Sequence, residues 1–162
     1  MSMETMEVAG NIFTLRRATA DDLEAIVELM HNDELRRQEL QDQPGNAESY
    51  LKAFNAIDSD PAHLLVVVEN QNHLVVGTMQ LTVIPGLSRG GASRLQIEAV
   101  RVHEQLRSNG LGSWMINWAV GEGRRRSVRL VQLTSDQARS SAHRFYERLG
   151  FSPSHIGFKL WL

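Results

Sequence analysis

The chain has 162 residues, 42% hydrophobic and 22% charged, which is ordinary for one globular domain with a sizeable core. Its net charge of −2 argues against a nucleic-acid binder that works by neutralising phosphates. The absence of cysteine excludes disulfides, thiolate metal sites and a cysteine nucleophile. No apolar run approaches the roughly 18 residues that span a bilayer, and the first ten residues do not resemble a signal peptide. We therefore expect a cytoplasmic protein with no membrane or nucleic-acid partner.

The N-terminal part predicts a strand and then a helix. Residues 1–10 are expected to form a loose lead-in. In residues 11–18, Ile12, Thr14 and Arg16 alternate with Phe13, Leu15 and Arg17, which is typical of a strand with one buried face. Thr19 or Asp21 is suited to cap the next helix. That helix places four apolar residues on one side at helical spacing: Leu23, Ile26, Val27 and Met30.

The next part predicts two helical pieces and a hairpin. Residues 31–60 are divided into the two pieces by Pro44-Gly45-Asn46. Residues 63–69 and 73–84 are rich in β-branched side chains and predict two strands joined by three polar residues. Gly77 in the second strand indicates a bend or bulge.

A loop, a strand and a helix follow. Residues 85–93 (PGLSRGGAS) predict a loop, and 94–102 (RLQIEAVRV) a further strand. A helix with one apolar side is expected to begin after Gly110 and to end in the basic run 122–126. Basic side chains are common at a solvated C-terminal helix end, because they interact favourably with the helix dipole, so this run does not by itself indicate a binding patch. A short strand is expected at 128–133.

The C-terminal part completes the predicted fold. Residues 138–149 predict a helix that Gly150 ends as a C-cap, and 151–162 alternate well enough to predict a terminal strand. The order β-α-α-β-β-β-α-β-α-β predicts one α+β domain over residues 1–162. In the simplest packing, helices cover both faces of a largely antiparallel sheet, giving α/β/α layers.

One turn in this order has the features of an anion site. Residues 107–112, between strand and helix, have the sequence R-x-x-G-x-G. Glycines there let the backbone approach a ligand closely, and the first N–H groups of the helix point at it with the positive end of the helix dipole. Such a turn can hold a pyrophosphate.

Two common phosphate motifs do not fit this turn. A Walker loop needs a lysine after its second glycine, but Gly112 is followed by Ser113 and Trp114. A dinucleotide fingerprint needs a third glycine where this chain has Met115, and it lies early in a parallel unit. The turn alone is a weak signal, so its meaning depends on its context.

Two segments together supply that context: V-R-V…R-S-N-G-L-G at 100–112 and A-H-R-F-Y-E-R-L-G-F at 142–151. With them the sequence resembles the GNAT superfamily of acetyl-CoA-dependent N-acetyltransferases over nearly its whole length. The resemblance implies acetyl-CoA as cosubstrate and no metal. It also implies a mixed, mostly antiparallel sheet in which a bulge splays the fourth and fifth strands and leaves a slot for the pantetheine arm.

The resemblance assigns cofactor contacts to two groups of residues. The backbone of Val100, Arg101 and Val102 would pair with the pantetheine arm. The turn would wrap the pyrophosphate, mainly through N–H groups, and Ser113 would add a hydroxyl. The residues of the turn are Arg107, Ser108, Asn109, Gly110, Leu111 and Gly112.

The resemblance also implies an acid and a base. Tyr146 matches a tyrosine that lies near the coenzyme sulfur and protonates the leaving thiolate. Glu98 matches a glutamate that faces the cleft and deprotonates the amine, directly or through a water. Period-two alternation puts Gln96, Glu98 and Val100 on one strand face. A packing aromatic at Tyr146 and a solvated Glu98 are the structural alternatives.

The chain departs from the family pattern at Arg139, where many relatives have an asparagine that contacts the cofactor. Arg139, or Ser140 and Ser141, would then take over that contact, or the contact is absent. The six histidines show no metal-ligand spacing. His143 and His155 are expected to be surface or packing residues.

The leading hypothesis is acetyl transfer to a primary amine of a small molecule, by direct attack in a ternary complex. A protein or peptide acetyltransferase and a non-catalytic acyl-CoA sensor are the alternatives. The acceptor surface is expected from residues 31–60 and 85–93, whose mixed charges leave the amine unidentified. The oligomeric state is also open, and a homodimer is compatible with the resemblance.

Overall fold

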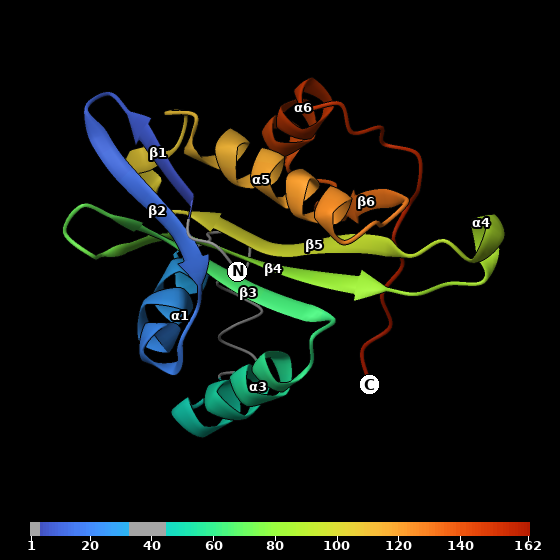
Figure 1. Cartoon of the computed structure of the whole chain (residues 1–162), viewed down its shortest axis with the longest axis horizontal. Helices are drawn as coiled ribbons and strands as arrows, with labels where there is room; N and C mark the ends of the chain where they lie inside the picture. The colour runs from blue at the N-terminus through green and yellow to red at the C-terminus, as the bar shows by residue number, and fades with distance from the viewer. Residues whose placement is uncertain (1–3, 33–44) are drawn as a thin grey trace.

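Six strands form one mixed sheet, in a computed structural model that describes residues 4–32 and 45–162 (Figure 1). The strands lie in chain order, antiparallel to their neighbours except for the parallel pair β5–β6. Their bounds are β1 Glu4–Val8, β2 Asn11–Arg17, β3 His63–Asn70, β4 Val75–Ile84, β5 Arg94–Val102 and β6 Leu130–Leu133. The predicted strands from 11 to 133 are confirmed.

Helices cover both faces of the sheet, so the predicted α+β layers are confirmed. In Figure 1, α5 and α6 lie above the sheet and α1 and α3 lie below it. The helices are α1 Leu23–His31, α3 Ala47–Ser59, α4 Ser88–Gly91, α5 Leu111–Arg125 and α6 Ser140–Arg148, with short 3-10 turns at Ala20–Asp22 and Glu104–Leu106. The first predicted helical piece of 31–60 falls mostly outside the described residues.

The expectation of a loose lead-in at 1–10 is wrong for residues 4–8. These residues form β1 and pair with β2 in a hairpin. Its turn is Ala9-Gly10, with φ of 50° and 79°. Positive φ at both central residues gives a turn whose twist matches that of the two strands.

Strand β3 shows how the core is divided between the two faces. Leu64, Val66 and Val68 belong to the cluster that packs on α5. Leu65 and Val67, between them, belong to the cluster that packs on α1 and α3. Successive side chains of a strand point to opposite faces, so this nearly continuous apolar run is buried on both sides.

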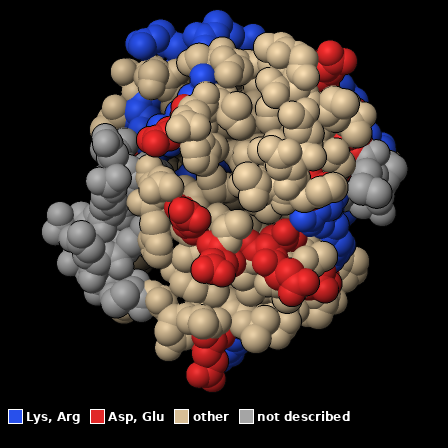
Figure 2. All heavy atoms as spheres, turned by 90° about the vertical axis from the view of Figure 1, so that its left-hand side faces the viewer, with Lys and Arg blue, Asp and Glu red and all other residues tan. Residues whose placement is uncertain are grey.

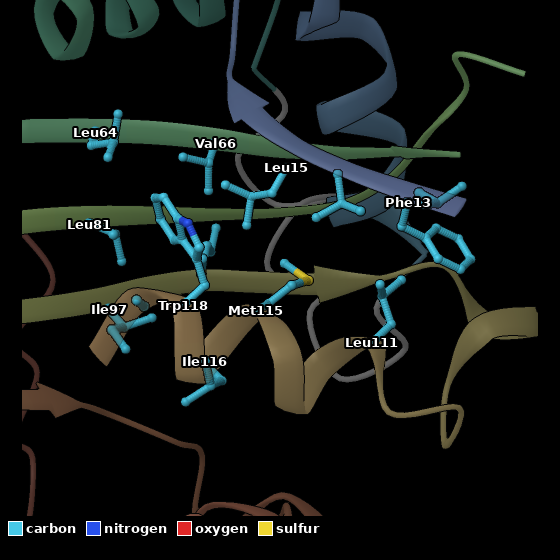
Figure 3. Packing of buried hydrophobic residues seen from close by; sticks show 14 of the residues in the cluster. Phe13, Leu15, Leu64, Val66, Leu81, Ile97, Leu111, Met115, Ile116 and Trp118 are labelled. Carbon is cyan, nitrogen blue, oxygen red and sulfur yellow. The ribbon is translucent and has the colours of Figure 1, made fainter. Parts of the chain in front are cut away.

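The face under α5 carries the larger cluster. Figure 3 shows Met115 and Trp118 pointing from α5 toward the strands. Met115 is fully buried, and its sulfur lies 3.1 Å from the position that a Cβ at Gly77 would occupy. The register of β3 and β4 shifts beside Gly77, which confirms the predicted irregularity. The glycine leaves room for the helix to approach the sheet.

The predicted terminal strand is wrong. Helix α6 ends at Arg148 with Leu149 as its C-cap, and Gly150, the predicted C-cap, follows one residue later with a φ of 91°. Residues 151–162 form no strand. Phe151 is half-buried, every later residue is exposed, and Figure 1 shows the segment running away from α6 past the end of the sheet. Strand alternation is present, but no strand of residues 4–32 and 45–162 pairs with the segment.

Candidate active site

The turn before α5 has the geometry of an anion site. Gly110 is the N-cap, with φ of 85°, and the residues before it are exposed. The first helical hydrogen bond runs from the Trp114 N–H to the Gly110 carbonyl at 3.0 Å. The N–H groups of Leu111, Gly112 and Ser113 therefore precede the helical ladder and are oriented toward a ligand at this end. These donors fit a pyrophosphate.

Other residues of the turn are placed close to the end of β5. The Arg107 Nε donates to the Val102 carbonyl at 3.3 Å. Ser108 has a φ of 69°, and Ser108 and Asn109 are exposed at the tip. A Cβ at Gly112 would lie 3.9 Å from Val102 and 3.6 Å from Phe145. The turn, the end of β5 and helix α6 thus meet at one end of the sheet.

A bulge in β5 separates two sets of side chains. Gln80 of β4 pairs with Glu98, and Thr78 pairs with Arg101, so β5 has one residue more than β4 in this interval. Ala99 lies in it with a φ of 51°, which is uncommon for a residue other than glycine. Bulges of this kind re-aim side chains.

Because of the bulge, the predicted shared face of Gln96, Glu98 and Val100 is wrong. Val100 packs against the cluster under α5, as Val102 does. Glu98 lies opposite Gln80, on the face toward α1 and α3. Side chains of β5 alternate between the two faces of the sheet up to Glu98. After the extra residue Ala99 they alternate again, but even-numbered residues now point to the α5 side.

The strands on either side of the proposed cofactor slot diverge at the expected place. The parallel pairing of β5 with β6 runs from Arg94–Leu130 to Ile97–Leu133 and ends there. Beyond it, β5 continues to Val102. The β1 hairpin shifts the numbering, so the strands predicted as fourth and fifth are β5 and β6.

A pair of glutamines joins these strands just before they diverge. The Gln132 Nε2 donates to the Gln96 Oε1 at 2.6 Å, and the Gln96 side chain is buried. Period-two alternation predicts the strand face of Gln96 but not its hydrogen-bond partner. Its partner could have been suspected from a second glutamine in the apolar strand 130–133.

A pocket of about 170 Å³ opens on the other face of the sheet. Gln80, Thr78, Leu65 and Ala99 form its sheet side. Helices α1 and α3 supply the rest of its lining: Leu23, Ile26, Val27, Met30, Tyr50, Ala53, Phe54 and Ile57. The sequence does not mark these residues as pocket residues, because the pocket needs the packing of two helices on the sheet.

Tyr146 lies on α6 near the end of β5. Its ring makes edge-on contacts with Phe145 and Phe151, at centroid distances of 5.1 and 5.9 Å. Burial raises the pKa of its hydroxyl above 10, and the positive charges of Arg139 and Arg101 offset part of this effect. Tyr146 is therefore protonated at neutral pH. Arg139, the departure from the family pattern, thus lies close enough to act on Tyr146 electrostatically.

The charges on one face of the molecule are segregated. Figure 2 shows Lys and Arg gathered along its upper edge and a band of Asp and Glu below them. The two views differ by a turn about the vertical axis, so the upper part of this face corresponds to the upper part of Figure 1, where β1, α5 and α6 lie. An anionic ligand is favoured at the upper edge, and a cationic one beside the acidic band.

Residues 4–32 and 45–162 contain neither a membrane-spanning helix nor a cluster of metal ligands. No helix there is long and apolar enough to cross a bilayer. In the same residues, no group of three or more His, Asp or Glu side chains is arranged to hold a metal ion.

The fold and the geometry of the turn are those expected of an acyltransferase that uses acetyl-CoA, and comparison with known proteins identifies the family. Residues 24–151 match the model of the acetyltransferase (GNAT) family, so the chain belongs to that family. It is 30% identical over 157 residues to an aminoalkylphosphonate N-acetyltransferase of Salmonella typhimurium, with 96% of each chain covered. The chain is therefore an acetyl-CoA-dependent acyltransferase.

Solved structures share the fold of this chain. A transcriptional regulator from Bacillus halodurans is 38% identical, with a TM-score of 0.85 and coverage of 93% of this chain and 99% of that one. A predicted acetyltransferase from Clostridium acetobutylicum, solved with acetyl-CoA, shares the fold at 17% identity. Its TM-score is 0.68, with 91% of this chain and 95% of that chain covered.

Proposed function

We propose that the protein transfers the acetyl group of acetyl-CoA to the primary amine of a small molecule by direct attack in a ternary complex. The observation that carries this proposal is the bulge at Ala99. It puts the end of β5 and the anion-binding turn on the α5 side, while Glu98 and the pocket lie on the α1–α3 side. A cofactor and an amine can therefore approach the gap beyond Ile97 and Leu133 from opposite faces.

The residues proposed for cofactor binding form a continuous path. The turn 107–112 and the Ser113 hydroxyl would hold the pyrophosphate. The backbone of Val100, Arg101 and Val102 would pair with the pantetheine arm, because the partner strand β6 has diverged by that point. Acetyl-CoA supplies an activated thioester.

We assign the two proton transfers to Glu98 and Tyr146. Glu98 would take the proton of the ammonium group, leaving a nitrogen lone pair that attacks the thioester carbonyl. As the C–S bond breaks, the Tyr146 hydroxyl would give its proton to the sulfur, so the products are an amide and a free thiol. A hydroxyl with a raised pKa holds its proton until the thiolate develops.

The pocket supports a small acceptor with an apolar portion. Its volume of about 170 Å³ suits a few carbon atoms, and most of its lining is aliphatic or aromatic. Short aminoalkylphosphonates are the first acceptors to test, because one relative is named an aminoalkylphosphonate N-acetyltransferase. The lining residues within the described part of the chain include no Lys or Arg, so a phosphonate group would lie toward the rim of the pocket.

A panel of acceptors tests this proposal. Release of free thiol from acetyl-CoA would be followed with short aminoalkylphosphonates, alkylamines of matched length and a peptide with a free N-terminus. We expect thiol release with the small amines and an equal amount of N-acetylated product by mass spectrometry. Turnover of the peptide alone would support a protein acetyltransferase. Binding of acetyl-CoA without turnover of any amine would support a sensor.

A further inference from the structure

The bulge in β5 brings two side chains of opposite charge to one face of the sheet. Glu98 pairs with Gln80, which lines the pocket beneath α1 and α3. Arg101 pairs with Thr78, which lines the same pocket. Residues three apart on a regular strand would point to opposite faces, so the extra residue at Ala99 is what puts the carboxylate and the guanidinium on the same side.

The two charged residues are spaced like the ends of a short molecule. Their partners on β4 are two residues apart, so Glu98 and Arg101 lie about 7 Å apart along the sheet, at about 3.4 Å per residue. The Glu98 side chain is exposed and that of Arg101 is half-buried. An amine held by the carboxylate and an acidic group held by the guanidinium would then be separated by a few carbon atoms, beside the apolar pocket.

The Arg101 guanidinium lies close to the proposed reaction centre. Its Nη1 donates to the Val100 carbonyl at 2.8 Å, which restrains the orientation of the group. Burial raises the pKa of the Tyr146 hydroxyl, and the positive charges of Arg139 and Arg101 lower this pKa in part. The charge of Arg101 therefore acts at the hydroxyl that is proposed to give its proton to the leaving sulfur.

The phosphates of acetyl-CoA have a different proposed site from this cation. The anion-binding turn leads into α5 and lies with the end of β5 on the α5 side. Arg101 shares its face with Thr78, on the α1–α3 side. The guanidinium is therefore placed to meet the acceptor, and its planar fork of N–H donors matches the oxygens of a phosphonate or a carboxylate.

We infer that the acceptor is a small zwitterion whose primary amine meets Glu98 and whose acidic group, a phosphonate or a carboxylate, is bound by the Arg101 side chain. The inference rests on the proposed function, because it adds a specificity-determining residue to the same acceptor site. The backbone of Arg101 keeps its proposed pairing with the pantetheine arm, while its side chain selects the acceptor. A simple alkylamine offers no anion to the guanidinium, so it should be a much poorer acceptor.

Three acceptors of equal chain length test the inference. Propylamine, β-alanine and 2-aminoethylphosphonate share an amine and a short carbon chain, and they end in a methyl group, a carboxylate and a phosphonate. For the wild type we expect kcat/KM to be at least about 30-fold higher with one of the two zwitterions than with propylamine, within the range for hydrogen bonds to a charged group. The better zwitterion identifies the acidic group. Equal kcat/KM for all three would overturn the inference and leave the proposed function intact, whereas no turnover of any amine would contradict the proposed function itself.

Replacement of Arg101 tests whether its side chain causes the preference. Arg101→Met removes the charge and keeps an unbranched chain, so we expect the ratio of kcat/KM between the preferred zwitterion and propylamine to fall about 30-fold. Both acceptors are measured on the same variant, so any effect on cofactor binding or folding cancels in the ratio. Arg94→Met is the matched control, since Arg94 begins the same strand on the other side of the bulge, and it should keep the wild-type ratio. An unchanged ratio in Arg101→Met, or an equal fall in Arg94→Met, would overturn the inference.

Discussion

Glu98 of β5 lies directly opposite Gln80 of β4, and Gln80 lines the pocket beneath α1 and α3. The bulge at Ala99 leaves Glu98 on the same face of the sheet as the pocket, while Val100 and Val102 pack under α5. One irregular residue thus divides β5 between the face that carries the pocket and the face that packs under α5. We propose that this division brings amine and thioester together.

If Glu98 removes the amine proton, Glu98→Gln should lower kcat/KM for the amine about 100-fold near pH 7, within the range for a lost general base. The loss should shrink near pH 10, where a typical primary amine deprotonates without help. Initial rates across this pH range measure both effects. Glu7→Gln, on exposed β1, is the control and should keep the wild-type rate. A deficit that is equal at both pH values would rule out the proposed role.

Replacement of Tyr146 by phenylalanine should lower kcat about 100-fold and leave KM for acetyl-CoA within about twofold, because the hydroxyl acts on the departing sulfur. Since burial raises the pKa of Tyr146 above 10, its acid form persists through the alkaline range. The wild-type kcat should therefore show no descending limb below pH 10. Unchanged turnover in the variant would leave Tyr146 with only a packing role.

The pair formed by Arg16 and Asp22 should stabilise the fold. The guanidinium donates to both Asp22 oxygens, at 2.8 and 2.9 Å, and to Glu69 at 2.9 Å. Asp22→Asn should lower the free energy of unfolding by about 2 kcal/mol, less than for a fully buried pair, because 24% of the Arg16 side chain is exposed. Urea unfolding measures the change. Asp58→Asn, which breaks the exposed pair with Arg17, should cost less than about 1 kcal/mol.

The same pair gives the stability a pH dependence. Burial would raise the pKa of Asp22, but hydrogen bonds from Arg16 and Thr19 and the charge of Arg16 together lower it. A lowered pKa in the folded state means that the stabilisation is present above the unfolded value near 4 and is lost as pH falls through the folded value. The difference between wild type and Asp22→Asn should therefore shrink below pH 4. A difference that persists at pH 2 would contradict this account.

Local patterns in the sequence were enough to predict most elements. The apolar periodicity of 94–102 and of the helix after Gly110 matches β5 and α5 closely, because each pattern is set by packing on the adjacent layer. Strand β1 was missed because Ala9 is an unusual residue for a turn with positive φ. Alternation within 151–162 predicted a strand, but the partner of a strand is not encoded in the strand itself.

The candidate site was predictable only where its parts are contiguous in sequence. The turn at Gly110 was found from its glycines, and its helix-capping geometry agrees with the proposed role. The face of Val100 was predicted wrongly, because neither glycine nor proline marks the bulge at Ala99. The acceptor pocket needs α1, α3 and three strands to pack together, and no local pattern describes that packing.

The most direct test of the account is calorimetric titration of acetyl-CoA into two tryptophan variants. Gly110 and Gly10 have similar φ values, 85° and 79°, and a Cβ at either would meet no atom within 4 Å. Both substitutions impose similar backbone strain, but only Gly110 lies in the proposed pyrophosphate turn. We predict that Gly110→Trp weakens binding at least about 100-fold, a loss of about 2.7 kcal/mol, while Gly10→Trp stays within about threefold of wild type. Equal affinity in the two variants would contradict the central claim that this turn holds the cofactor.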